Sequence, residues 1–308
     1  MKIAFMWKWW SGKTTLSSHF VKYLEVNYVH EKKLIFDVDI NSHLWKELGF
    51  ISPEPLWINF ENIFEILEPS LVNKFWFNNI PTVWTFPITK NSTLIYPDKI
   101  DSYWLEKYYT QKNNSFFFES WNFIDQDSWK HNCYHGMLNT YELFIHHIRD
   151  SKKDFIIADT TAGGDNLWTS LFMSYDLTCF IVEPTMRSIQ VYKDYMKIAD
   201  QKNIYVIVNK VRSKKDLDFV YSQINKNDIL CHFDFNTWVY RWETNDFLIN
   251  EKNNFELIVN KLFSIEKNWK CYYSQINALY IKEVNGWFSD FHNMDLEKLI
   301  ISKNKLWE

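Results

Sequence analysis

Short, continuous runs of apolar residues alternate with longer amphipathic stretches along most of the chain. The short runs predict buried strands, and the stretches, in which apolar residues recur every three or four positions, predict helices. Continuous apolar strands that alternate with helices are typical of a doubly wound, mainly parallel sheet flanked by helices, so we predict an α/β fold. The predicted strands cover residues 2–6, 33–39, 115–119, 155–159, 177–183, 204–209 and 229–233, and the predicted helices cover residues 14–26, 136–149, 185–201 and 214–225.

The pattern divides the chain into a large first part, residues 1–250, and a helical end. Six of the seven prolines fall between residues 51 and 114, so we predict an irregular insertion of mixed helix and loop there, which carries partner specificity. Residues 251–308 are typical of charged amphipathic helices that close the fold. For residues 296–306 we expect a packed terminal helix, and a membrane-surface helix is the alternative.

Composition and charge exclude several classes of protein. A hydrophobic fraction of 46% in 308 residues fits a globular protein with a large core. The net charge of -4 disfavours a general nucleic-acid binder. No apolar run reaches the roughly 20 residues that span a bilayer, and the N-terminus lacks the apolar region of a signal peptide. The four cysteines are widely spaced, which suits a reducing compartment. We therefore expect a cytoplasmic protein that binds neither membrane nor nucleic acid.

Residues 7–15 carry a conflict between motif and residue type. They read Trp-Lys-Trp-Trp-Ser-Gly-Lys-Thr-Thr between a predicted strand and a predicted helix. The phosphate-binding loop G-x-x-x-x-G-K-[ST] has the same order, and it needs glycine because its backbone N–H groups approach a phosphate closely. Trp7 occupies the first glycine position, whereas Gly12, Lys13 and Thr14 match the pattern.

The amino-acid counts suggest an origin for these tryptophans. Average usage of about 7% predicts about 22 glycines in a chain of this length, and the chain has 6 glycines and 16 tryptophans, together 22. Some bacterial codes read UGA as glycine and others read it as tryptophan, so decoding with the wrong table would produce this composition. Deliberate substitution and a truly tryptophan-rich chain are the alternatives. Four further tryptophans lie in turn-like polar surroundings, as misread glycines would: Trp45, Trp121, Trp238 and Trp242.

Four motifs occur in a fixed order along roughly the first 250 residues. Residues 8–15 read K-W-W-S-G-K-T-T, residues 36–44 carry D-x-D-x-N, and residues 158–165 read A-D-T-T-A-G-G-D. The fourth motif has two parts, a strand-end asparagine within residues 208–210 and a later segment at residues 231–234. The ordered set resembles the MinD/ParA family of dimeric P-loop ATPases, and within it the accessory ATPases of metalloenzyme maturation such as CooC. In that family the first motif is K-G-G-x-G-K-T-T, so two of its glycines are tryptophans here.

The resemblance implies a P-loop NTPase fold and gives roles to the residues after the first strand. Lys13 would bind the β- and γ-phosphates of ATP, Thr14 would ligate Mg²⁺, and Thr15 would contact the α-phosphate at a helix N-terminus. Lys8 resembles a signature lysine that reaches the partner's nucleotide across a dimer, so catalysis would require a homodimer. The loop that contacts the nucleotide would comprise Trp7, Trp9, Trp10, Ser11, Gly12, Lys13, Thr14 and Thr15.

Later strand ends complete the implied site. Asp39 would orient the attacking water, and Asp37 and Asp159 would support Mg²⁺; for each carboxylate, capping of the next helix is the alternative. The backbone of Gly163 would sense the γ-phosphate as a switch. The residues that would enclose adenine are Asn209, Lys210, Phe233 and Asp234, and a simple turn asparagine is the alternative for Asn209.

Cys133 and His135 lie near the place where CooC-like proteins carry Cys-x-Cys. One such pair from each of two subunits could bind Zn²⁺ or another transition metal, although the second cysteine of the pattern is a histidine here. We predict that the neighbouring pair His146 and His147 lies on a helix surface.

The function that the resemblance implies is a dimeric molecular switch. It would bind ATP with Mg²⁺ and hydrolyse ATP to ADP and phosphate, and so drive assembly or maturation of a partner protein, including metal insertion into a metalloenzyme. The first alternative is a ParA/MinD-like partition or positioning ATPase. If Trp7, Trp9 and Trp10 are real, hydrolysis is impaired and a nucleotide-independent binding protein becomes the second alternative.

Overall fold

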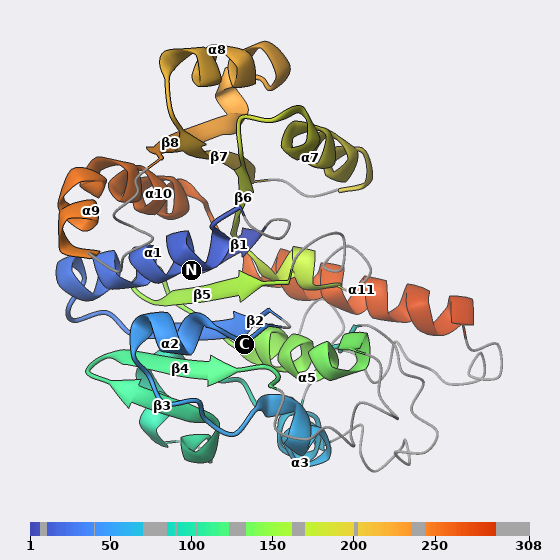
Figure 1. Ribbon diagram of the computed structural model, residues 1–308. Helices are drawn as coiled ribbons and strands as arrows, with labels where there is room; N and C mark the ends of the chain where they lie inside the picture. The colour runs from blue at the N-terminus through green and yellow to red at the C-terminus, as the bar shows by residue number, and fades with distance from the viewer. Residues whose placement is uncertain are drawn as a thin grey trace.

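Eight strands form one sheet, and seven of them are parallel (Figure 1). The computed structural model describes residues 1–6, 11–39, 41–69, 85–89, 91–102, 104–122, 134–161, 170–199, 203–235 and 244–287. The strands are β1 (Lys2–Met6), β2 (Lys33–Val38), β3 (Tyr109–Lys112), β4 (Ser115–Glu119), β5 (Phe155–Thr160), β6 (Leu177–Val182), β7 (Ile204–Val211) and β8 (Ile229–Asp234). Their order across the sheet is β3-β4-β2-β5-β1-β6-β7-β8, and only β3 runs antiparallel to its neighbour.

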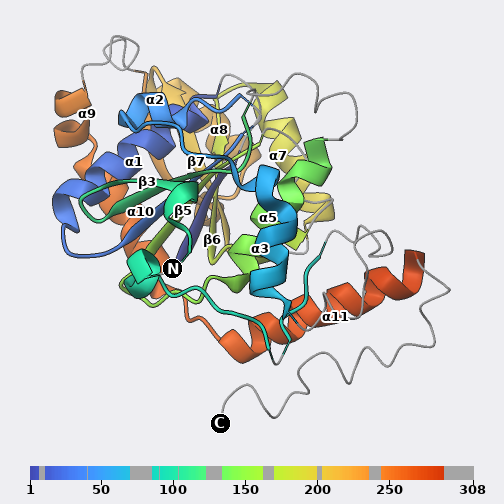
Figure 2. The same cartoon turned by 90° about the horizontal axis from the view of Figure 1, so that it is seen from below.

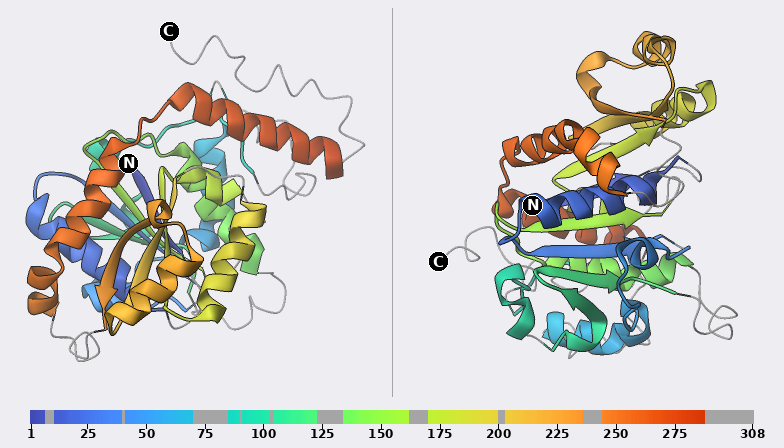
Figure 3. Two further views of the ribbon diagram at one scale, coloured as in Figure 1. Left: turned by 90° about the horizontal axis from the view of Figure 1, so that it is seen from above. Right: turned by 60° about the vertical axis from the view of Figure 1, so that its left-hand side comes forward.

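Helices cover both faces of the sheet. Among the described residues the α-helices are α1 (Lys13–Asn27), α2 (Leu44–Leu48), α3 (Phe60–Leu67), α5 (Tyr134–His147), α7 (Met186–Ile198), α8 (Lys214–Gln223), α9 (Thr244–Asn250), α10 (Lys252–Ser264) and α11 (Trp269–Trp287). Short 3-10 turns add η1 (Leu56–Asn59), η3 (Pro97–Ser102), η4 (Glu106–Tyr108), η6 (Ser170–Ser174) and η7 (Lys226–Asp228). Figures 2 and 3 show α1, α9 and α10 on one side of the sheet and α5 and α7 on the other. The sequence prediction of a doubly wound, mainly parallel sheet is therefore confirmed.

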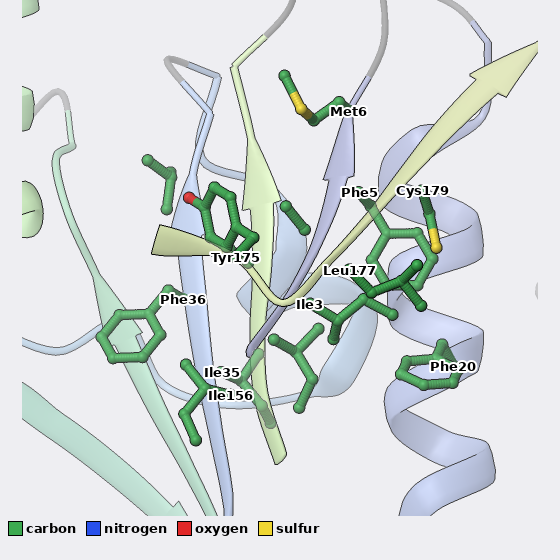
Figure 4. Packing of buried hydrophobic residues seen from close by; sticks show 14 of the residues in the cluster. Ile3, Phe5, Met6, Phe20, Ile35, Phe36, Ile156, Tyr175, Leu177 and Cys179 are labelled. Carbon is green, nitrogen blue, oxygen red and sulfur yellow. The ribbon is translucent and has the colours of Figure 1, made fainter. Parts of the chain in front are cut away.

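The central strands are buried on both faces because successive side chains point to opposite helical layers. Every residue of β1, β2, β5 and β6 is buried. On one face Phe5 packs against Phe20 of α1, with ring centroids 5.4 Å apart (Figure 4). On the other face Phe36 packs against Tyr141 and Phe144 of α5. This two-sided burial explains why these strands read as continuous apolar runs in the sequence.

All seven predicted strands are present, and their ends agree within two residues. The prediction missed β3, which lies at the sheet edge inside the segment predicted to be irregular. Two of its four residues are exposed, so the strand has no apolar run that could reveal it. A turn at Asn113, with φ of 51°, reverses the chain from β3 into β4.

The prediction that His146 and His147 lie on a helix surface is wrong. Both side chains are fully buried near the end of α5. His147 Nε2 lies 2.7 Å from Glu68 Oε1. Burial and the nearby Lys2 charge lower the pKa of His146 well below its usual value. The sequence could not show this because α3 and the segment after residue 85 cover the polar side of α5 through Glu68 and Phe86.

The first helix of the segment from residue 251 onward, α10, packs into the main core. Phe255 of α10 stacks on Tyr23 of α1, with ring centroids 5.5 Å apart. Residues 288–308, including the predicted terminal helix at 296–306, lie outside the described residues. The division at residue 250 stays a prediction. Among the described residues no helix is long and apolar enough to cross a membrane.

A buried ionic cluster fastens the amino end of β1 to the segment before α11. Asp150 receives the Met1 amine at 2.6 Å and Lys267 Nζ at 2.8 Å, and Lys267 also lies 2.9 Å from Asp176. Lys2 Nζ donates to the Ile145 carbonyl oxygen at 2.6 Å and lies 3.9 Å from Asp150. Three buried cations thus share two carboxylates, which makes the charged form of Lys2 unfavourable.

Lys2 should make the stability of the protein depend on pH. Burial and the Lys267 charge lower the pKa of Lys2 to about 7, whereas an unfolded lysine titrates near 10.4. Between these values the unfolded state binds more protons, so the free energy of unfolding rises with pH. Relative to Lys2→Met, we expect the unchanged protein to gain about 1–2 kcal/mol from about pH 7 to about pH 9. Urea unfolding measures this gain. The exposed Lys214→Met is the control, and a constant or falling difference would contradict the assignment.

Candidate functional site

The carboxyl ends of neighbouring strands bring the sequence-predicted residues together. In an open parallel sheet, ligands bind beyond these ends. The start of α1 follows β1, and the pairing of β2, β5 and β1 places Asp37 beside Asp159 and Asp159 beside Phe5. The described residues gathered here are Ser11, Gly12, Lys13, Thr14, Thr15, Asp37, Asp39, Asp159, Asn209 and Lys210.

Lys13 is the centre of the group. It is the first residue of α1 and is 6% exposed. Its Nζ lies 2.7 Å from Asp39 Oδ2 and 3.1 Å from Asp159 Oδ1, and it also donates to the Thr160 carbonyl oxygen. Burial alone would lower the pKa of Lys13, but the charges of Asp159 and Asp39 outweigh it and raise that pKa above its usual value. The ammonium group is therefore held charged between two carboxylates.

Asp159 connects the lysine to the next residue of the helix. The Thr14 hydroxyl donates to Asp159 Oδ2 at 2.7 Å. Burial raises the pKa of Asp159 and Lys13 lowers it, with a net increase. The Lys13 charge and the hydrogen bonds from Lys13 and Asn41 outweigh the effect of burial on Asp39 and lower its pKa. The two carboxylates that contact Lys13 thus have pKa values shifted in opposite directions.

Asp37 makes the contacts of a helix cap. Its Oδ2 accepts a hydrogen bond from the Leu44 backbone N–H at 2.9 Å, at the first residue of α2. Its Oδ1 accepts one from the Asp39 backbone N–H at 3.2 Å. Burial and the charge of Asp159 raise the pKa of Asp37 well above its usual value. These contacts match the capping alternative, and Mg²⁺ support by Asp37 stays a prediction.

Gly12 and Asn209 fix the shape of the turn before α1. Gly12 has φ of 85°, in the left-handed region that favours glycine. The side-chain amide of Asn209 donates to the Ser11 carbonyl oxygen at 2.7 Å. A Cβ on Gly12 would lie 2.7 Å from Asn209 Nδ2. The turn therefore requires glycine at this position both for its backbone angle and for its contact with β7.

The residues predicted to contact adenine and the α-phosphate make other contacts in the structure. Lys210 has φ of 61°, and its Nζ lies 2.6 Å from Glu183 Oε1. Phe233 is buried against Phe247 and Phe255, whereas Asp234 is exposed. The Thr15 carbonyl oxygen faces His19 Nδ1 at 2.6 Å. Adenine contacts by Lys210, Phe233 and Asp234 and the phosphate contact of Thr15 stay predictions.

Several predicted site residues lie outside the described residues. These are Trp7, Lys8, Trp9, Trp10, Cys133 and Gly163, together with the side chain of His135. Within the described part of the chain, no group of three or more His, Cys, Asp or Glu side chains could hold a metal ion. The Zn²⁺ site at Cys133 and His135 stays a prediction.

The turn-like setting predicted for two tryptophans is only partly found. Trp45 is the second residue of α2 and packs against the core, so the predicted turn is wrong there. Trp121 follows β4 in an irregular segment and is 2% exposed. Trp238 and Trp242 lie outside the described residues.

The sequence interpretation missed Glu119. This residue ends β4, is fully buried, and pairs in register with Asp37. Burial raises its pKa, although hydrogen bonds from Ser52 and Asn122 oppose that rise. Several apolar runs end in an acidic residue, among them those that end at Asp37, Glu119 and Asp159. That repeated ending was a signal for Glu119, because strand ends meet at one edge of a parallel sheet.

Solved structures resemble this protein in fold. A ParA family ATPase from Chlorobium tepidum TLS matches with a TM-score of 0.53 and 12% identity over 85% of this chain and 98% of that one. A McdA variant from Cyanothece, solved with ATP, matches with a TM-score of 0.50 and 12% identity over 87% of this chain and 97% of that one. The chain has a ParA-type P-loop fold. No protein-family model and no curated protein matches its sequence.

Proposed function

We propose that the protein is a switch ATPase of the ParA/MinD kind, which positions or partitions a cellular cargo as an ATP-dependent homodimer in the cytoplasm. The observation that carries this proposal is the placement of Lys13 between Asp39 and Asp159 at the start of α1. The fold supports it, because the ParA family ATPase of similar fold is named as an ATPase. The ATP in the McdA structure supports the choice of nucleotide.

The ion pairs of Lys13 suit a residue that exchanges partners. A triphosphate at the N-terminus of α1 would offer Lys13 oxygen atoms of higher charge than the two carboxylates. Lys13 would then leave Asp39, whose carboxylate would become free to orient a water molecule for attack on the γ-phosphate. The same geometry thus provides a charged phosphate ligand and a candidate for positioning the nucleophile.

The oxygen atoms around Thr14 fit Mg²⁺. Thr14 and Asp159 supply a hydroxyl and a buried carboxylate within 2.7 Å of each other, and Mg²⁺ prefers such oxygen ligands together with water and phosphate. Thr14 would bind the ion directly, and Asp159 would bind its water shell. When bound, Mg²⁺ would neutralise part of the charge on the phosphates.

Two other functions stay as predictions. Metal insertion into a metalloenzyme depends on Cys133 and His135 and has no support among the described residues. A nucleotide-independent binding role depends on Trp7, Trp9 and Trp10, because three indoles would fill the volume of a triphosphate. The variant that combines Trp7→Gly, Trp9→Gly and Trp10→Gly, here called the triple-glycine variant, separates this role from the ATPase function.

Thr14→Ala tests the proposed Mg²⁺ contact. In the triple-glycine variant we expect this change to weaken ATP binding by about tenfold when Mg²⁺ is present, because one ligand of the ion is lost. With the chelator EDTA the two proteins should bind ATP equally. Isothermal titration in both buffers measures the difference, with Ser17→Ala as the control, since the Ser17 hydroxyl only donates to the Thr14 carbonyl oxygen. Equal loss in both buffers would contradict a Mg²⁺ role.

A further inference from the structure

Several contacts hold the segment after β2 against the rest of the protein. Asp39 pairs with Lys13, and Asp37 accepts a hydrogen bond from the Leu44 backbone N–H. Between these two points, the Ser42 hydroxyl donates to Glu119 Oε1 at the end of β4. The first contact involves the proposed phosphate ligand, so nucleotide binding would remove it. The other two contacts would remain.

The carboxylate of Glu119 accepts hydrogen bonds from three side chains. Its side chain is fully buried, and a buried carboxylate is costly unless donors surround it. The Ser42 hydroxyl donates to one of its oxygens, and the Ser52 hydroxyl and the Asn122 amide donate to the other, the latter at 3.0 Å. Glu119 therefore joins the segment after β2 to Ser52, in the chain that follows α2.

Ser42 needs a restraint of this kind. It has φ of 45°, in the left-handed region that residues with a Cβ adopt rarely. Its backbone N–H donates to the Asp39 carbonyl oxygen at 3.1 Å, which closes a tight turn around Asn41. Asn41 in turn donates to Asp39 Oδ1 from its backbone and its side chain, both at 3.0 Å. The conformation of Ser42 is thus linked through this turn to the direction of the Asp39 carboxylate.

We propose that Glu119 is a positioning residue that holds Asp39 in place through Ser42. The inference rests on the proposed function, because Asp39 matters only if it orients water near a nucleotide. While Lys13 is paired with Asp39, that ion pair fixes the carboxylate directly. Once a phosphate binds Lys13, three contacts keep Asp39 near the reacting atoms: the Glu119–Ser42 hydrogen bond, the Asp37–Leu44 hydrogen bond, and the hydrogen bond from the Asp39 backbone N–H to Asp37 Oδ1.

A purely structural role for Glu119 makes a different prediction. If the carboxylate only stabilises the fold around it, then loss of either serine hydroxyl should have the same effect. If Glu119 positions Asp39, then Ser42→Ala should reproduce the effect of Glu119→Gln, and Ser52→Ala should not. Ser52→Ala is a matched control because it removes a hydroxyl donor from the other oxygen of the same carboxylate.

Hydrogen exchange in the nucleotide-free chain tests the restraint without any catalysis. The amides of Asn41, Ser42 and Leu44 are hydrogen bonded within this segment. We expect Glu119→Gln and Ser42→Ala each to speed their exchange by about tenfold, since Ser42→Ala removes the hydrogen bond to a buried charge and Glu119→Gln removes the charge that strengthens it. Ser52→Ala should change it by less than about twofold. Equal exchange in all four proteins, or equal acceleration by all three changes, would overturn the proposal.

Kinetics of the triple-glycine variant test the consequence for the reaction. Glu119→Gln and Ser42→Ala should lower kcat for ATP hydrolysis by about tenfold and leave KM within about twofold, and the double change should lower kcat no further. A rise in KM at constant kcat would overturn the positioning role. If the triple-glycine variant itself hydrolyses no ATP, the proposed function fails, whereas the exchange result still decides whether Glu119 restrains the segment.

Discussion

Lys13→Met is expected to reduce ATP hydrolysis by the triple-glycine variant by about 100-fold or more, because one charged group that contacts the transferred phosphate is lost. The same change should destabilise the nucleotide-free protein by about 3–5 kcal/mol. Lys13 is the cation that separates two carboxylates, which are 14% and 1% exposed. Without it, Asp39 and Asp159 would repel each other or take up a proton. Phosphate release measures the first effect, and urea unfolding at pH 7 measures the second.

A surface lysine provides the control for this experiment. Lys197 pairs with Asp194, and both side chains are more than half exposed. Solvent screens such a pair, so Lys197→Met should change neither hydrolysis nor unfolding measurably. If Lys13→Met were as active and as stable as the Lys197→Met control, Lys13 would have neither the catalytic nor the electrostatic role assigned to it.

Glycine at positions 7, 9 and 10 is expected to raise both ATP affinity and stability. Each backbone N–H that can approach a phosphate adds a charge-assisted hydrogen bond of about 1.5–3 kcal/mol, so one or two regained contacts correspond to roughly a hundredfold gain in affinity. Tryptophan at a position that requires positive φ costs about 1–3 kcal/mol in strain. Urea unfolding should therefore show a higher free energy of unfolding for the triple-glycine variant.

Two further measurements show whether the gain is specific to the loop and whether its tryptophans are natural. Trp104→Gly removes a half-buried indole far along the chain from the loop, and it should leave ATP affinity unchanged.

The mass of the peptide that covers residues 1–22, taken from the protein's own cell, tells whether tryptophan or glycine is present there. A mass that fits tryptophan would contradict the misread-glycine hypothesis.

The fold could be predicted from the sequence because strands that are buried on both faces consist of continuous apolar residues. Strands covered on both faces are apolar at every position, and β2 and β5 could be located from that pattern alone. The order of motifs then brought Lys13, Asp39 and Asp159 together, since the carboxyl ends of parallel strands share one edge. These residues lie within hydrogen-bonding distance in the structure.

The features that the sequence did not reveal depend on contacts between distant segments. The edge strand β3 has no apolar run, because only one neighbour covers it. His147 is polar and yet buried, since Glu68, the residue after α3, contacts it. In the sequence, Glu119 resembles any acidic residue at a strand end. Its role depends on hydrogen bonds from Ser42 and Ser52, which are distant from it in the chain. Buried polar side chains that form hydrogen bonds with each other produce no periodic pattern of apolar residues in the sequence.

Titration of ATP into the triple-glycine variant in the presence of Mg²⁺ is the decisive experiment for the proposed nucleotide site. We expect saturable binding of one ATP per chain, which Lys13→Met weakens by about 100-fold. If the variant is folded, as its unfolding transition would establish, and binds no ATP, then the Lys13 site is not a nucleotide site and the proposed function is wrong.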